Sequence, residues 1–135
     1  MNRAIELHDS IVEFILPHGD QTTIELNPAY LHESTDRPGV DAGIGFLQNI
    51  HVQLKGAEID SFLEDLPVRI TDGWILAGER RFKNLVPLPL IHVGHTELGF
   101  STDKGEALRL RASGIVIILS GEKRKVEQFN SPTAT

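Results

Sequence analysis

The feature that most constrains the fold is a hydrophobic alternation with a period of two residues. Between residues 44 and 54, apolar side chains recur on one face, at Ile44, Phe46, Ile50, Val52 and Leu54. Successive side chains of a β-strand point to opposite faces, so this pattern predicts a half-buried strand. Residues 108–112 repeat the alternation. The runs at 11–16 ("IVEFIL") and 115–119 ("IVIIL") are apolar on both faces, which predicts strands covered on both sides.

Turn-forming residues separate these segments at intervals of about ten residues. Short groups rich in Gly, Asp and Ser lie at residues 18–20, 36–39, 55–56, 72–73, 77–79, 103–105, 113–114 and 120–122. These residue types favour tight turns between strands. The sequence therefore predicts an all-β protein: an antiparallel β-sandwich or flattened barrel of about nine short strands, with little or no helix.

Two segments depart from this simple pattern. Residues 56–67 carry apolar side chains at helical spacing, but we expect a strand that runs into a short loop. Residues 84–90 contain Pro87 and Pro89, which cannot donate backbone hydrogen bonds, so this segment is predicted to be an edge strand or a connector.

Length and composition predict one domain over residues 1–129, followed by a disordered tail at 130–135. The absence of cysteine excludes disulfides, thiolate nucleophiles and cysteine-based zinc sites. The longest aliphatic run is too short to cross a bilayer, and charges near the N-terminus do not fit a secretory leader. We therefore expect a cytoplasmic protein that does not associate with membranes.

The net charge of −6 argues against general affinity for nucleic acid or anionic membranes. Six basic residues nevertheless form two short clusters: Arg80, Arg81 and Lys83 in one, and Lys123, Arg124 and Lys125 in the other. Two solvated turns are the ordinary interpretation of such clusters. A local anion-binding patch is the alternative, if the fold brings them together.

Two similar segments, "LHDS" (residues 7–10) and "LHES" (residues 31–34), each combine a histidine, a carboxylate and a hydroxyl. This combination indicates either a turn or a metal-binding or catalytic site. Ile5 and Leu7 lie at odd positions, whereas the apolar residues from Val12 to Leu16 include a set at even positions. If both sets face the core, the strand must contain a bulge or corner near Asp9 and Ser10. On a straight strand His8 and Asp9 would point to opposite faces. His32 is predicted to end a strand and Ser34 to begin a turn.

The histidines provide the alternative, a divalent-metal site. His8, His32 and His51 with Asp9 or Glu33 would suit zinc, iron, nickel or manganese, if separate strands converge. His92, His95 and Glu97 form a second candidate set: His95 and Glu97 share a strand face, and a bulge at Gly94 would bring the two histidines together. The spacing differs from the H-x-H motif of cupins, and no second cupin motif follows.

Familiar catalytic patterns are absent from the sequence: it has no nucleophile elbow, phosphate-binding loop or HExxH motif. Gln48 is polar on the otherwise apolar face of residues 44–54, so we expect it to find buried hydrogen-bond partners.

The first 30 or so residues, with "LHDS", an apolar stretch, a polar hairpin and "TTIEL", resemble small bacterial all-β proteins of unknown function. Some of those proteins are classed with toxin-immunity and other interaction modules. The resemblance implies a β fold and a non-enzymatic role, and it assigns no functional residue.

Taken together, these observations favour a non-enzymatic binding or interaction module without a cofactor. Its partner would be another protein or a second copy of the chain, because exposed edge strands often pair with each other. A metal-dependent enzyme or metal-binding protein is the alternative.

Overall fold

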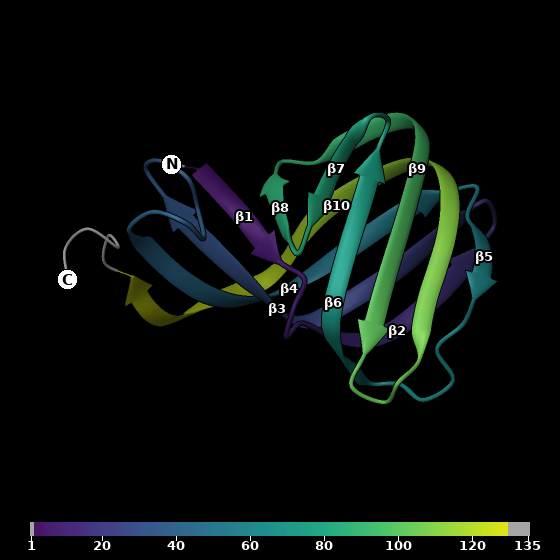
Figure 1. The fold of residues 1–135 in the computed structure, drawn as a ribbon, viewed down its shortest axis with the longest axis horizontal. Helices are drawn as coiled ribbons and strands as arrows, with labels where there is room; N and C mark the ends of the chain where they lie inside the picture. The colour runs from purple at the N-terminus through teal and green to yellow at the C-terminus, as the bar shows by residue number, and fades with distance from the viewer. Residues whose placement is uncertain (1, 130–135) are drawn as a thin grey trace.

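The computed structural model describes residues 2–129, which form one ten-stranded antiparallel sheet (Figure 1). The strands are β1 (Asn2–Glu6), β2 (Ile11–His18), β3 (Gln21–Ser34), β4 (Gly43–Lys55), β5 (Glu58–Ser61), β6 (Val68–Ala77), β7 (Arg80–Lys83), β8 (Leu85–Leu88), β9 (Ile91–Thr102) and β10 (Ala107–Phe129). The described residues contain no helix, and hence none long and apolar enough to span a membrane. The all-β prediction is confirmed.

Part of the sheet closes on itself. The strands follow the order β2-β6-β9-β10-β4-β3, and β3 pairs again with β2 to complete a ring. The junction between β2 and β6 is narrow, since only Ile11 and Val12 pair there, with Arg69 and Val68. The ring is therefore not a regular barrel, which is consistent with the prediction of a sandwich or flattened barrel.

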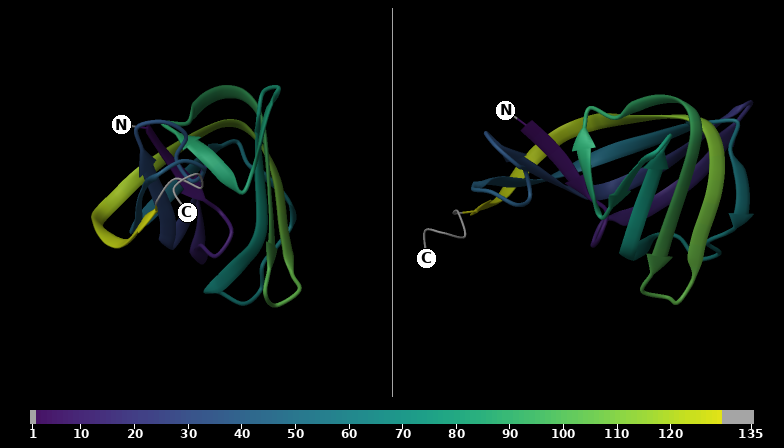
Figure 2. Two further views of the ribbon diagram at one scale, coloured as in Figure 1. Left: turned by 60° about the vertical axis from the view of Figure 1, so that its left-hand side comes forward. Right: turned by 45° about the horizontal axis from the view of Figure 1, so that its top comes forward.

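Three long strands continue past the ring into an open extension, seen on the left of Figure 1 and from two other directions in Figure 2. There the order is β10-β4-β3-β1-β8. Register shifts mark the passage from ring to extension, between Leu26 and Ala29 in β3 and between Ser120 and Arg124 in β10. An extra residue in one strand bends that strand, so these irregularities change the direction of β3 and β10 where they leave the ring.

The core follows the alternation of the sequence. In β4, Ile50, Val52 and Leu54 are fully buried, while the residues between them are partly exposed. β10 repeats the pattern with Leu108 and Leu110 buried. Burying each such side chain contributes about 1.5–3 kcal/mol relative to leaving it exposed.

The two unusual segments have the predicted structures, whereas neither doubly apolar run is covered on both sides throughout: Leu16 of β2 and Ile118 of β10 are exposed. Residues 56–67 form β5 and a loop, and β8 is an edge strand that pairs only with β1. Leu16 of β2 is exposed, because β2 pairs with β6 only at its first two residues. The predicted tail at 130–135 lies outside the described residues.

Candidate functional site

The "LHDS" segment forms a sharp corner between β1 and β2. Asp9 has a φ of 70°, and the Ser10 backbone N–H donates to the Leu7 carbonyl over 3.1 Å. The buried Ser10 hydroxyl donates to the Glu6 carbonyl over 2.6 Å. The predicted break at Asp9 and Ser10 is confirmed.

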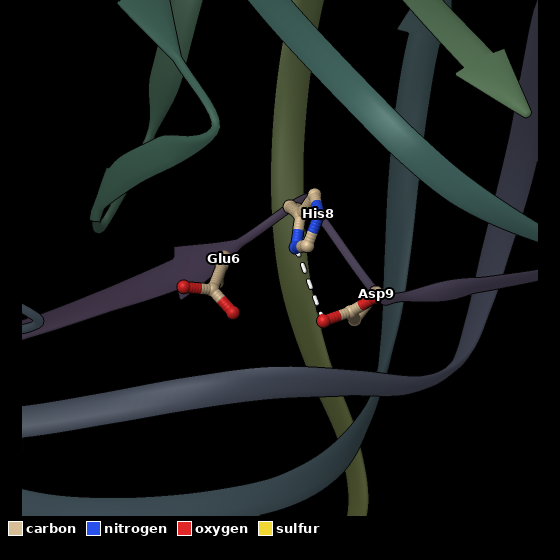
Figure 3. A group of neighbouring side chains, drawn as sticks. All are labelled: Glu6, His8 and Asp9. Carbon is tan, nitrogen blue, oxygen red and sulfur yellow. Dashed lines mark ion pairs between the residues drawn. The ribbon is translucent and has the colours of Figure 1, made fainter.

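The prediction that His8 and Asp9 point to opposite faces is wrong, because this corner brings their side chains together. His8 Nδ1 lies 3.1 Å from Asp9 Oδ2 (Figure 3). Alternation holds only along an extended strand, and the left-handed backbone at Asp9 turns its carboxylate back toward the imidazole.

Glu6 joins this pair, so that one ligand atom from each of Glu6, His8 and Asp9 lies within 4.8 Å of the others (Figure 3). A basic residue also reaches the group: Arg69 Nη1 donates to Asp9 Oδ1 over 2.6 Å. The guanidinium already neutralises the carboxylate that a metal ion would need, and its positive charge opposes a cation nearby.

Among the described residues, the other histidines of the first predicted metal set do not join this group, although His32 lies beside Glu6. His32 lies at the end of β3, its Nε2 3.7 Å from Glu6 Oε1 and its ring 4.8 Å from that of Tyr30. His51 lies beside Glu25, at 3.9 Å between Nε2 and Oε2. As predicted, β3 ends at "LHES": the Ser34 hydroxyl donates to the Ala42 carbonyl and accepts the Asp36 N–H.

The second predicted set is only partly assembled. His95 Nε2 and Glu97 Oε2 are 3.0 Å apart, within hydrogen-bond distance. Gly94 has a φ of 129°, and the register of β9 against β10 shifts at this point, so the predicted bulge is present. Among the side chains that the structure describes, however, Glu6, His8 and Asp9 form the only group of three potential ligands that lies close enough for one ion. His92 therefore does not complete a site with His95 and Glu97.

The two basic clusters lie in strands, not in turns. Arg80 of β7 lies over the Phe82 ring at 5.7 Å. Lys123 of β10 lies 4.5 Å from the centroid of Phe46, and its Nζ donates to Glu33 Oε1 over 2.7 Å.

Arg124 and Lys125 continue β10 opposite Leu47 and Phe46 of β4. The sequence predicts a turn at residues 120–122, but β10 continues through them, and its register against β4 shifts between Ser120 and Arg124. Gln48 lies at this irregularity: its side-chain amide N–H donates to the Gly121 carbonyl over 3.0 Å, whereas its buried Oε1 has no hydrogen-bond partner among the described residues. The prediction of buried partners is therefore met for one end of the amide only.

A third site, on the outer face of the ring, centres on Trp74. Trp74 of β6 alternates with buried Gly73 and Ile75, so its side chain faces outward. Its register partner on β9 is Gly99. A Cβ atom at residue 99 would lie 2.5 Å from indole atoms Nε1 and Cε2, which means that the indole lies directly across the Gly99 backbone.

Two arginines from other strands lie over this indole. The guanidinium carbon of Arg81 (β7) is 5.0 Å from the ring centroid and that of Arg109 (β10) is 5.5 Å away. Lys83 is the register partner of Trp74 and so shares its face. Among the described residues, no carboxylate lies within 4.0 Å of any of these three cations.

Arg111, two residues beyond Arg109 on the same face, has a different environment. Hydrogen bonds to Asp60 raise the pKa of Arg111, and the negative charges of Asp60 and Glu58 add to this effect. Arg111 is therefore already neutralised within the protein, whereas Arg109 is available to an external anion.

The Trp74 site includes a surface groove of about 410 Å³. Trp74, Leu76, Arg81, Glu97 and Arg109 are among its lining residues. Glu97 is mostly buried and is held by His95. The groove thus combines an apolar wall, two guanidinium groups and one carboxylate. We call it the Trp74 groove.

Sequence reasoning found Arg81 and Glu97 but missed Trp74, Gly99 and Arg109. One signal was present: Trp74 is the only tryptophan of the chain, and it alternates with the apolar residues of a strand. A second was the outward position of Arg109 between Leu108 and Leu110.

No protein-family model, no curated protein and no solved structure matches this chain.

Proposed function

We propose that this chain is a non-enzymatic cytoplasmic binding module that takes up an anionic ligand in the Trp74 groove. One observation carries the proposal: Arg81 and Arg109 come from different strands to one outward-facing indole, and among the side chains of residues 2–126 neither has a carboxylate partner. Lys83 adds a third cation to the same face.

Stacking on the indole prepares the two arginines for binding. A guanidinium that lies on an aromatic face keeps the N–H groups at its edge available, and these match the geometry of carboxylate and phosphate. The stack also restricts the side-chain rotamers before the ligand arrives, which lowers the entropic cost of binding. The groove is thus a local cationic site on a protein with a net charge of −6.

The single tryptophan makes the test direct. Inorganic pyrophosphate should change the Trp74 fluorescence saturably, and the effect should weaken with added salt because the attraction is electrostatic. Arg81→Met and Arg109→Met should each weaken binding about tenfold or more, since a hydrogen-bonded charge contact contributes about 1.5–3 kcal/mol.

Arg37→Met is the matched control, because Arg37 is paired with Asp41 and does not line the groove. It should leave pyrophosphate affinity nearly unchanged. If neither fluorescence nor calorimetry detects pyrophosphate binding at low salt, the proposal is wrong.

Self-association is a second part of the proposal. Within the described residues, the outer edges of β8 and of the last part of β10 carry no strand partner. Such edges offer unpaired backbone groups to a second copy. Light scattering should give a mass above that of one chain, and a strictly monomeric mass at high concentration would refute this part.

Metal binding is the second candidate function, favoured by the Glu6, His8 and Asp9 group. Elemental analysis of untagged protein tests it. Near-stoichiometric zinc, nickel, iron or manganese that disappears in His8→Ala would establish a metal site, whereas metal-free protein that binds none of these ions on addition would exclude it.

A further inference from the structure

The Trp74 groove contains a feature that a simple anion site would not have: the carboxylate of Glu97 lies in the same groove as Arg81 and Arg109. We infer that its ligand is a phosphate monoester of a polyhydroxylated compound, the sugar phosphate class. This inference rests on the proposed function, since it specifies what the same groove binds.

The cations indicate more than one negative charge on the ligand. Arg81, Arg109 and Lys83 are without ion-pair partners in the part of the chain that the structure describes. A single carboxylate would satisfy one guanidinium bidentately and leave the other cations without an anionic partner. A phosphate monoester carries about two charges and three acceptor oxygens at neutral pH, enough for both guanidinium groups.

Glu97 indicates hydrogen-bond donors next to that phosphate. Its Oε2 faces His95 Nε2 at 3.0 Å, which keeps the carboxylate in place on the groove wall. It is mostly buried, so its charge is only partly screened by water. A bare oxyanion would be repelled here, but a ligand hydroxyl can donate to a carboxylate oxygen in a charge-assisted hydrogen bond.

The remaining wall suits the carbon skeleton of such a ligand. Leu76 lies between Arg81 and Glu97 in the register of the sheet, and it lines the groove together with Trp74. The C–H face of a sugar ring can pack on an apolar side chain such as that of Leu76. The groove volume of about 410 Å³ lies within the usual range for small-molecule sites, roughly 300–1,000 Å³.

Glucose 6-phosphate, inorganic phosphate, glucose and glycine are the probes, each titrated into the full chain and followed by Trp74 fluorescence and calorimetry. Glucose 6-phosphate should bind about tenfold more tightly than inorganic phosphate, because one charge-assisted hydrogen bond is worth that factor. Glucose alone should not bind measurably.

Glu97→Gln separates the inference from the proposed function. In this variant the advantage of glucose 6-phosphate should shrink, while inorganic phosphate should bind as well or better because the repulsion is removed. Circular dichroism and the emission maximum of Trp74 would verify that the variant is folded.

The outcomes that overturn the inference are distinct. Equal affinity for glucose 6-phosphate and inorganic phosphate, or an unchanged ratio in Glu97→Gln, would refute the ligand class and leave the anion site standing. Tighter binding of glycine than of either phosphate would identify a zwitterion site instead. Failure of all three anionic or zwitterionic probes and of pyrophosphate would remove both proposals.

Discussion

The indole of Trp74 lies across the backbone of Gly99 on the neighbouring strand, with no room for a Cβ atom at residue 99. This contact places the ring flat on the sheet, where Arg81 and Arg109 can lie over it. The Trp74 groove therefore depends on a glycine that itself carries no functional group.

Replacing Gly99 tests this dependence. In Gly99→Ala the new methyl group would lie 2.5 Å from indole atoms, so the ring must move off the strand. We expect a red-shifted, more exposed Trp74 emission, weakened pyrophosphate binding and a loss of about 1–3 kcal/mol in the free energy of unfolding. Ser120→Ala, a small change at a partly exposed residue of β10 that does not line the groove, should change none of the three. An unaltered Trp74 emission in Gly99→Ala would contradict the packing.

The ion pair of Lys123 and Glu33 joins residues from β10 and β3 across the intervening β4. Glu33 is buried, so Lys123→Met would leave its carboxylate without a counter-charge and lower the free energy of unfolding by about 1–3 kcal/mol in urea denaturation. Lys125→Met is the control, since Lys125 is exposed and should stay within about 0.5 kcal/mol of the parent.

The double variant Lys123→Met, Glu33→Gln makes that test more specific. It removes both charges and should recover part of the lost stability, because no unpaired carboxylate stays buried. Additive losses in the double variant would show that the two residues act independently.

The left-handed backbone of Asp9 supports a comparison of two substitutions that both remove the charge. Asn tolerates a φ of 70°, whereas the β-branched Val does not. Both variants lose the ion pair with Arg69, so their difference isolates the backbone cost. Asp9→Val should be less stable than Asp9→Asn by about 1–2 kcal/mol in thermal or urea denaturation. Equal stabilities would show that the corner has rearranged.

The loop between β3 and β4 should respond to pH through one ion pair. Hydrogen bonds from Arg37 lower the pKa of the Asp41 carboxyl below its usual range. The unfolded chain therefore binds this proton more readily than the folded one. The contribution is present above the unfolded-state pKa and is lost as the pH falls through the lower, folded-state pKa.

Carbon-detected NMR titration of Asp41 measures this pKa directly. Arg37→Met should raise it toward its ordinary value, because the side-chain hydrogen bonds and the positive charge are removed, while the backbone N–H of residue 37 still donates. Lys104→Met, a change of one exposed cation elsewhere, should leave it unaltered. An identical Asp41 pKa in the parent and Arg37→Met would contradict the ion pair.

Several features could be predicted from the sequence because they depend on near neighbours in the chain. Alternation at Ile50, Val52 and Leu54 identified the buried face of β4. The change of the apolar residues from odd to even positions predicted the corner at Asp9 and Ser10. Pro87, which cannot donate a backbone hydrogen bond, predicted that β8 lies at an edge. Strand geometry and turn chemistry act over a few residues, so no knowledge of the partner strand was needed.

Which side chains meet was decided only by the tertiary structure. Alternation shows that Trp74, Arg81 and Arg109 face outward, but it does not reveal that β7, β6, β9 and β10 are neighbours in this order. His8 and Asp9 likewise meet only because the backbone turns between β1 and β2. The physical reason is that long-range strand pairing and register are set by burial of the whole core, whereas the local pattern specifies the face of each residue and not its neighbours across the sheet.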